Sequence, residues 1–273
     1  MSLWQTITSD YFILSVVKGV RIEFAAYPKQ IIIPREYYFN ATEVIISDNQ
    51  IEQFLETGVT EKTTHSKGEC ISNIFLRPKK YGSYRLLLNL KYLNEFVEYH
   101  HFKIENRKSF IICRSPNCYM ASIDLKDAYH SVSIGGPNHK KYLRFKLKNQ
   151  SSFLFLTMFW EHLSRHQSFQ FTCLPNGLSR APRIFTKLLK PTYSVLRSKG
   201  LKTWHILMTL ISKGTPFLIM KQMYLPLSGY LQTWLWRKHG KIILIPSKVI
   251  TLWGFVLNSV QMTISLTPFK AWN

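Results

Sequence analysis

The chain has 273 residues, 46% of them hydrophobic, which is enough to bury the core of one large domain or two smaller ones. This composition excludes a disordered tail, and the 36 Lys and Arg against 15 Asp and Glu give a formal net charge of +21. Such an excess points to a polyanionic partner, nucleic acid first and an anionic membrane surface second, although a charge imbalance with no partner behind it is the alternative.

Cysteine spacing and apolar segments bear on the compartment. The four cysteines show no paired CxxC spacing, so neither a zinc site nor a disulfide framework is expected. Residues 1–19 lack the basic start and cleavage site of a signal peptide. Polar Asn258, Ser259 and Gln261 interrupt the uncharged stretch 249–269, which argues against a membrane helix. We therefore expect a protein that is intracellular, cytoplasmic or nuclear, and not secreted.

The first half of the chain predicts a short helix and a basic hairpin. Ile51, Phe54 and Leu55 fall on one helical face, with Ser47 or Asp48 suited to begin the helix and Gly58 to end it. Two strand-like runs follow, "ISNIFLRPKK" and "SYRLLLNL", joined by a turn that contains Gly82. These runs predict a hairpin over residues 71–90.

The second half predicts further strands around one long helix. The run "CYMASID" predicts a strand that ends at Asp124, followed by a turn or short helix and by the alternating strand "YLRFKL". Helical spacing continues from residue 178 to 200, with Pro191 expected to bend the helix. Alternation on both sides of Asn258 and Ser259 predicts a terminal hairpin.

Taken alone, the acidic motif of "ASIDLKDAY" is not specific. Asp124 and Asp127 after a strand are more often a helix cap and a solvated acid than a metal site, and "LPNGLSRAP" is most simply a loop that enters a helix. The order of the segments is more informative. An Arg-bearing hairpin "YRLLLNLKYLN" precedes "ASIDLKDAY", then come "FTCLPNGLSRAPRIF" and "LWGF".

This series resembles the fingers and palm of a reverse transcriptase, and in detail the polymerase of DIRS-type retrotransposons. The runs "NIFLRPKKYGSYRLLLNLKYLNEFVEYHHFK", "CYMASIDLKDAY" and "QFTCLPNGLSRAPRIFTKLLKP" carry the resemblance. It implies an α+β fold with an antiparallel palm sheet backed by helices. It also implies five regions: an N-terminal extension (1–70), fingers (71–118), palm (119–200, with an atypical insertion at 148–168), a probable out-of-frame segment (201–243), and the end of the palm with a primer-grip-like hairpin (244–273).

The resemblance assigns roles to individual residues. Asp124 would be the first metal-binding carboxylate, beside the Leu125 carbonyl, and Tyr129 would lie under the incoming sugar and reject ribose. The remaining assignments are Arg85 with Lys79 or Lys80 for the triphosphate, Asn176 and Gly177 for template and nucleotide, Lys241 for the leaving phosphate, and Trp253 and Gly254 for the primer end. The implied partners are an RNA or DNA template-primer and a deoxynucleotide.

The implied chemistry requires more than one carboxylate. Two divalent cations, Mg²⁺ in this family, lie roughly 4 Å apart, activate the primer hydroxyl and neutralise the leaving pyrophosphate. Relatives supply two more carboxylates from a Tyr-x-Asp-Asp turn after the helix that here ends near residue 200. In this chain no Asp or Glu follows Glu161.

The genetic code offers an explanation. When the last base of each codon is joined to the first two of the next, Met208 and Thr209 force an Asp, and a Leu207 codon ending in G gives another. The shifted reading of "HILMTLISKGT" can thus spell Tyr-Ile-Asp-Asp. We infer that compensating frameshifts before Trp204 and Leu244 displace about forty residues, so the central hairpin should be disrupted and residues from Trp204 to about Lys241 poorly defined.

Three interpretations remain. The chain is a reverse transcriptase that is inactive as translated, a basic nucleic-acid-binding remnant without polymerase activity, or a conceptual translation with no stable protein. A divergent family member with its own packing is the alternative to the frameshift.

Overall fold

The computed structural model describes residues 2–35, 37–79, 82–103, 115–125, 127–148, 166–198, 200–206, 209–214, 242–252 and 254–267. The chain divides into two compact units, each assembled from segments that are separate in the sequence. The first unit comprises Met1–Leu14, His101–Ser131 and Pro182–Asn273, and the second comprises Ser15–His100 and Val132–Ala181.

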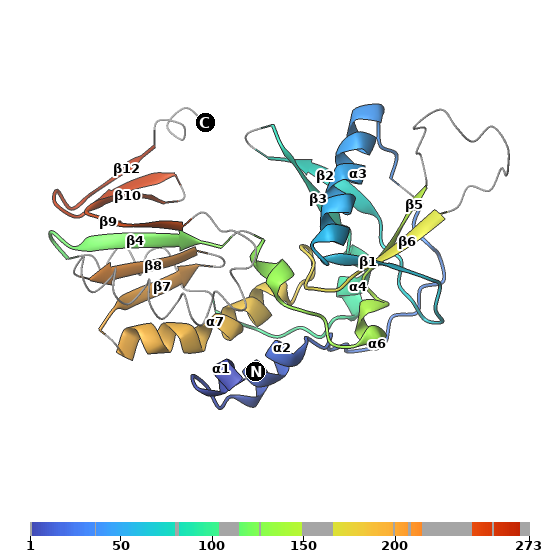
Figure 1. Ribbon diagram of the computed structural model, residues 1–273, viewed down its shortest axis with the longest axis horizontal. Coiled ribbons are helices and arrows are strands. Elements are labelled where there is room, and N and C mark those ends of the chain that lie inside the picture. Colours follow the sequence, from blue (N-terminus) through green and yellow to red (C-terminus); the bar gives the residue numbers. More distant parts are fainter. Residues whose placement is uncertain are drawn as a thin grey trace. The chain divides into compact units, whose positions relative to one another are not determined.

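A four-stranded antiparallel sheet forms the centre of the first unit (Figure 1). Its order is β7 (Lys202–Ile206), β8 (Thr209–Gly214), β4 (Tyr119–Asp124) and β9 (Ile242–Ser247). The strand that the sequence predicts to end at Asp124 is therefore confirmed as β4. It lies between β8 and β9, so the acidic end of β4 has a neighbouring strand on each side.

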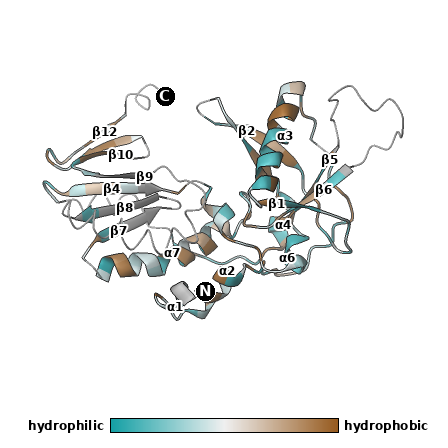
Figure 2. Cartoon of the chain, in the orientation of Figure 1, coloured by the Kyte–Doolittle hydropathy of each residue, from teal (hydrophilic) through white to brown (hydrophobic). Residues whose placement is uncertain are grey.

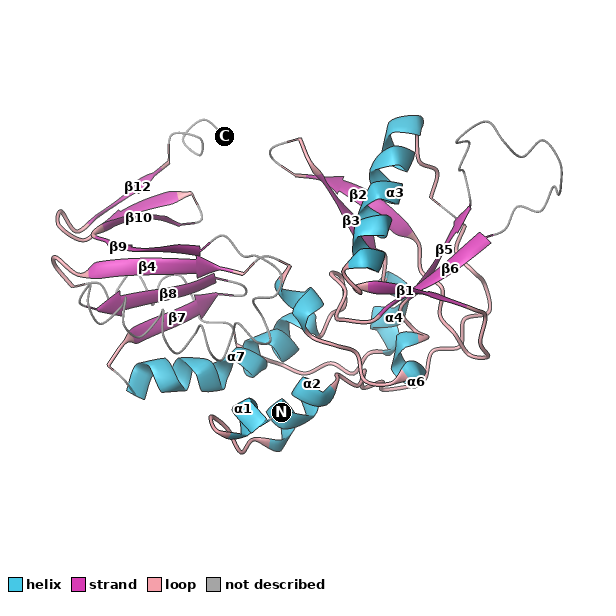
Figure 3. Cartoon of the chain, in the orientation of Figure 1, coloured by secondary structure: helices cyan, strands magenta, loops and turns pink. Residues whose placement is uncertain are grey.

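A smaller antiparallel sheet completes the strands of this unit. It consists of β10 (Val249–Leu252), β11 (Phe255–Asn258) and β12 (Thr263–Leu266), and the predicted terminal hairpin is confirmed as β11 and β12 (Figure 3). Every second residue of β10 is buried. Ile250, Leu252 and Leu257 pack with Met120 of β4 into one apolar cluster, which joins the two sheets.

Helix α7 (Ala181–Ser198) is the long helix that the sequence predicts, and it contains Pro191. Its buried residues include Ile184, Phe185, Leu188 and Leu189, at the helical spacing of one apolar face (Figure 2). At its C-terminal end the Arg197 guanidinium donates to the Thr203 hydroxyl (3.1 Å) and carbonyl (2.7 Å) of β7. The other helices in the described part of this unit are α1 (Ser2–Gln5), the beginning of α2 (Tyr11–Lys18) and the 3-10 helix η1 (Ala128–Ser131).

The second unit contains a three-stranded antiparallel sheet. Its order is β1 (Thr60–Thr63), β6 (His166–Phe171) and β5 (Arg144–Lys148), and β5 confirms the predicted alternating strand. On one face the rings of Phe145 and Phe169 stack with centroids 5.3 Å apart. Helix α3 (Ala41–Glu56) adds Phe54 to this core by an edge contact with Phe171.

The opposite face of the same sheet carries a buried ion pair. Arg144 pairs with Glu69, and its Nε donates to Gln170 Oε1 at 2.9 Å. Gln170 Nε2 in turn donates to Glu61 Oε1 at 2.7 Å. Burial opposes ionisation of Glu69, but hydrogen bonds from His65, Arg144 and the Ser66 amide outweigh it and lower the pKa of this carboxyl.

The predicted basic hairpin is confirmed as β2 (Ile74–Pro78) and β3 (Tyr84–Leu88). Helix α3 holds it through one amide side chain, because the Leu86 amide donates to Gln50 Oε1 (2.8 Å) and Gln50 Nε2 donates to the Tyr84 carbonyl (3.2 Å). The remaining helices of this unit are α4 (Lys91–Phe96), α6 (Pro137–Lys140) and the end of α2.

Helix α3 begins earlier than the sequence predicts. Its N-cap is Asn40, which forms a reciprocal capping box with Glu43, whereas Ser47 and Asp48 lie inside the helix. The prediction missed this start because it placed the cap close to Ile51 and did not use the capping-box spacing of Asn40 and Glu43. The predicted end is close: the helix stops at Glu56, and Gly58 takes a positive φ of 66°.

The expectation that residues from Trp204 to about Lys241 are poorly defined does not hold for two segments, which the structure describes as strands. Residues up to Ile206 and from Thr209 to Gly214 form β7 and β8, which pair with each other. Residues 207–208 and 215–241, together with most of the predicted insertion (149–165), lie outside the described residues. No helix in the described ranges is long and apolar enough to cross a membrane.

Candidate functional site

The acidic end of β4 lies beside the end of the β7–β8 hairpin. Asp124 is paired with Thr209, the first residue of β8, and Thr209 is also paired with Ile206, the last residue of β7. The last residue of β7 and the first residue of β8 therefore both lie near the acidic end of β4. On the other side of β4, Ile123 pairs with Ile242 of β9.

The donor groups at this end of the sheet do not fit a two-cation site. Such a site needs several converging carboxylates, because hard cations such as Mg²⁺ prefer oxygen ligands and need their charge offset. Asp124 ends β4 and the Leu125 carbonyl follows it, but β7, β8, their connection and β9 contain no Asp or Glu. Within the described strands of this sheet, one carboxylate and the Leu125 carbonyl are too few for two cations.

Tyr129 lies in η1, just after the acidic end of β4, and is buried. Its ring makes an edge contact with Phe185 of α7, with centroids 5.6 Å apart and planes at 79°. Burial raises the pKa of Tyr129 to about 12. The phenol is therefore neutral at physiological pH, and the ring is held by the same apolar core as α7.

The tip of the β2–β3 hairpin is strongly cationic. Arg85 lies directly opposite Arg77, and both side chains are exposed. Directly opposite like charges in an antiparallel pair repel each other, and among the described residues neither guanidinium pairs with a carboxylate. Lys79 is exposed beside them, and Lys80 lies outside the described residues. Arg77 was not among the predicted site residues, although the predicted hairpin places it on the strand that faces Arg85.

The predicted Asn176 and Gly177 lie in the turn that leads into α7. Gly177 adopts a φ of 106°, and a Cβ there would meet the Leu88 carbonyl oxygen at 3.0 Å. A side chain at this position would be both strained and crowded, so the turn needs glycine here. Asn176 is partly exposed.

The predicted primer-end residues lie at the β10–β11 connection. Gly254 has a φ of 81° and accepts a hydrogen bond from the Thr267 amide at 2.9 Å. Trp253 lies outside the described residues, as does Lys241, whose neighbour Ile242 begins β9.

The predicted site residues are divided between the two units. Asp124, Leu125, Tyr129 and Gly254 belong to the first unit. Lys79, Arg85, Asn176 and Gly177 belong to the second.

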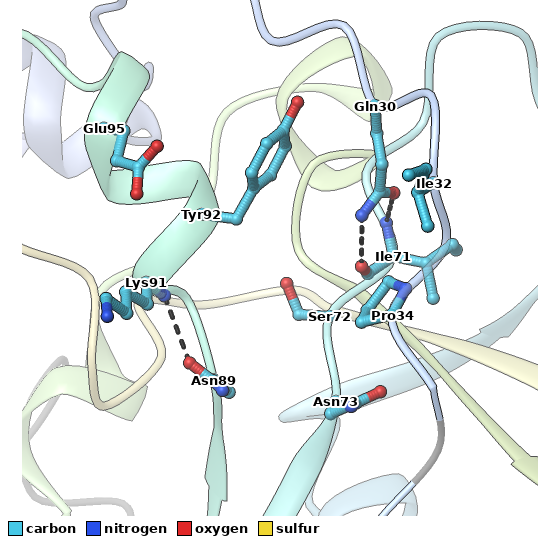
Figure 4. Close-up of a pocket in the computed structure, with 10 residues that line it drawn as sticks. All are labelled: Gln30, Ile32, Pro34, Ile71, Ser72, Asn73, Asn89, Lys91, Tyr92 and Glu95. Atoms are coloured by element: carbon cyan, nitrogen blue, oxygen red, sulfur yellow. Dashed lines mark hydrogen bonds between the residues drawn. The ribbon is translucent and has the colours of Figure 1, made fainter.

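A pocket of about 290 Å³ lies in the second unit, and its lining contains none of the predicted site residues that the structure describes (Figure 4). Gln30 anchors one wall through two hydrogen bonds with the backbone of Ile71, at 2.8 and 2.7 Å. Asn89 accepts from the Lys91 amide at 3.2 Å on the other wall. Sequence reasoning missed the pocket because its walls come from three separate segments, 30–34, 71–73 and 89–95.

One group of potential metal ligands lies elsewhere in the second unit. Side-chain atoms of Glu23, Glu98 and His100 lie within 4.8 Å of one another. The buried Arg180 guanidinium lies 2.6 Å from the Glu23 carboxylate. Since this positive charge already neutralises Glu23, the group is an ion-pair cluster.

Comparisons with known proteins agree with this arrangement. Residues 77–208, just under half of the chain, match the family model of the reverse transcriptases (RNA-dependent DNA polymerases). No curated protein matches the sequence significantly.

Two solved structures share the fold. The foamy viral protease-reverse transcriptase dRH in complex with double-stranded DNA has a TM-score of 0.63 at 18% identity, over 93% of this chain and 39% of that chain. The foamy viral protease-reverse transcriptase in complex with double-stranded DNA has a TM-score of 0.64 at 18% identity, over 92% and 48%. This chain thus spans less than half the length of the solved chains it matches. Together, the family match and the shared fold support a reverse transcriptase domain in this chain.

Proposed function

We propose that this chain is the fingers and palm of a DIRS-type retrotransposon reverse transcriptase whose polymerase activity has been lost. One observation carries the proposal. The register places the end of the β7–β8 hairpin beside Asp124, where a polymerase needs further carboxylates, and that hairpin contains none. The paired strands β7 and β8 of this hairpin are present, and its sequence contains no Asp or Glu.

The reading frame explains the loss. The two aspartates recovered by the shifted reading use bases of the Leu207, Met208 and Thr209 codons. These positions coincide with the connection that follows Ile206 and leads into β8. A frameshift that was unrelated to the lost motif would have no reason to restore acids at the turn next to Asp124.

A second candidate function is nucleic-acid binding without catalysis. The net charge of +21 favours it, as do the exposed Arg77 and Arg85 on the hairpin, which form no ion pair with a carboxylate of the described residues. The two foamy viral relatives were solved with double-stranded DNA. Phosphate contacts from Lys and Arg require no metal, so this property can outlast the polymerase reaction.

Primer extension by the purified chain tests the first proposal. We expect no product with Mg²⁺ or Mn²⁺, because one carboxylate cannot hold both cations. Synthesis that disappears in Asp124→Ala would overturn the claim of inactivity. A chain with the frame restored between residues 200 and 248 serves as the positive control and should extend primers in a manner that depends on Asp124.

Binding to a labelled template-primer at several salt concentrations tests the second candidate. The logarithm of the affinity should fall linearly with the logarithm of salt, as counterion release requires, and Arg77→Ala with Arg85→Ala should reduce that slope by about 2. Affinity that does not respond to salt would contradict nucleic-acid binding through the backbone phosphates.

A further inference from the structure

Asn94 of α4 connects the helix to the turn that contains Asn176 and Gly177. Its Nδ2 donates to the Gly177 carbonyl at 2.9 Å, and its Oδ1 accepts from the Ser179 amide at 2.9 Å. A single amide side chain thereby satisfies one acceptor and one donor of the same turn. All of these residues lie within the second unit.

The helix that presents Asn94 is itself firmly anchored. Leu90 and Leu93 are 2% and 0% exposed, and the Asn94 amide donates to the Leu90 carbonyl at 2.8 Å. The ends of the turn are fixed too, because Leu174 and Leu178 are buried. Between these anchors the exposed Gly177 has the wide conformational freedom of glycine. The two hydrogen bonds of Asn94 restrict the backbone from the Gly177 carbonyl to the Ser179 amide.

We infer that Asn94 is a positioning residue, which holds the turn so that Asn176 meets the template in one fixed geometry. The inference rests on the proposed function, in which Asn176 and Gly177 contact template and nucleotide. In this inference Asn94 does not contact the substrate. Asn94 acts only through its hydrogen bonds with the backbone of Gly177 and Ser179.

The experiment uses the full chain and a template-primer that carries 2-aminopurine at the first unpaired template position. Fluorescence of that base reports how the template is held at the turn, and hydrogen exchange of the Ser179 amide reports the contact itself. We expect Asn94→Ala to expose the amide and to lose most of the fluorescence change, with an unaltered salt dependence of binding. Asn176→Ala should lose the same signal.

Non-additivity separates positioning from general destabilisation. If Asn94 acts through the turn, the double variant N94A/N176A should lose no more fluorescence change than either single variant. Additive losses, or a fluorescence change that N94A leaves intact, would overturn the inference. The proposed function would then still stand, provided that the wild-type chain binds the template-primer, and a wild-type chain that does not bind would overturn both.

The conservative variant adds a pH profile and covers the case in which N94A fails to fold. In Asn94→Asp the carboxylate still accepts from Ser179 but repels the Gly177 carbonyl, and its protonated form can donate again. The fluorescence change should therefore be lost at pH 8 and recover towards about pH 5, since a facing carbonyl raises the pKa of a carboxyl. Asn89→Asp is the matched control: Asn89 uses its oxygen to accept from the Lys91 amide, which a carboxylate still does. A pH profile shared by both variants would contradict the positioning role.

Discussion

Asp124, the last residue of β4, lies directly opposite Thr209, the first residue of β8. Because Thr209 also pairs with Ile206, β7 ends and β8 begins near Asp124, the only acidic residue in the described strands of the four-stranded sheet. The three strands that accompany β4 in this sheet contain no Asp or Glu that could join Asp124.

Carboxylates placed at the connection between β7 and β8 should create a cation site. We expect Leu207→Asp combined with Met208→Asp to raise the affinity for Mn²⁺ by roughly tenfold or more, since affinity for hard cations grows with the number of charged oxygen ligands. Titration followed by electron paramagnetic resonance measures free Mn²⁺ directly. Leu207→Asn with Met208→Asn has similar bulk without charge and should show no gain. If the gain in Mn²⁺ affinity persists when Asp124 is replaced by Asn, the new carboxylates do not share a site with Asp124.

Phe185 should be among the residues on which the stability of the first unit depends most. It is 1% exposed and packs against Tyr129, so Phe185→Ala removes a buried ring and leaves a cavity. We expect a loss of about 3–5 kcal/mol in the free energy of unfolding, measured with urea. Tyr11→Ala in α2 removes a ring that is 86% exposed and should change stability by less than about 0.5 kcal/mol. If the two substitutions lower the free energy of unfolding equally, Phe185 does not belong to the packed core of the first unit.

Stability of the second unit should depend on pH through Glu69. Its folded pKa is lowered from 4.5, so ionised Glu69 contributes stability above that pH, which is lost as the pH falls through the folded pKa. Glu69→Gln leaves Arg144 buried without its partner and should cost roughly 3 kcal/mol at pH 7. The difference from wild type should shrink below about pH 4.5.

The control for that measurement is Glu52→Gln, at an exposed position of α3. Denaturant unfolding of both variants between pH 3 and pH 7, followed by a probe in the second unit, gives the two profiles. If the free energy of unfolding of Glu69→Gln differs from that of wild type by the same amount at every pH in this range, the ion pair is not the source of the pH dependence.

The Gly177 turn should tolerate a methyl group less well than the tip of the basic hairpin. Gly177→Ala meets both a φ of 106° and the Leu88 carbonyl oxygen at 3.0 Å, whereas Gly82→Ala meets a φ of 74° in open space. We expect Gly82→Ala to cost about 1 kcal/mol and Gly177→Ala about 2–3 kcal/mol. Thermal unfolding measures both, and an equal cost would mean that the crowding at Leu88 is relieved without strain.

Much of the fold was predictable because local patterns and packing agree. Strand β3 buries Leu86 and Leu88, two residues apart, and α7 buries Ile184 and Leu188 on one helical face, as their sequence periods predict. The beginning of α3 was missed because Val44, Ile45 and Ile46 are consecutive β-branched residues, which do not have the spacing of one helical face.

The sequence predicted which residues belong to the candidate site, but it did not predict which residues they contact. Resemblance identified Asp124 and Gly177, but pairing partners such as Thr209 depend on register between distant segments. Asn94 was missed for the same reason: its two partners lie 83 and 85 residues away in the sequence. The hairpin strands β7 and β8 were missed because the absence of family-like residues there was taken as absence of structure, whereas strand pairing with β4 uses the backbone.

The nucleotide sequence of the gene and its transcript across the codons for Gly200 to Lys248 tests the central claim most directly. The account predicts that the shifted frame reads Tyr-x-Asp-Asp, with the two Asp codons at the connection between Ile206 and Thr209 and with frame-changing lesions on both sides. A shifted frame without that motif would contradict it, and the missing carboxylates would then be a property of the protein as it evolved.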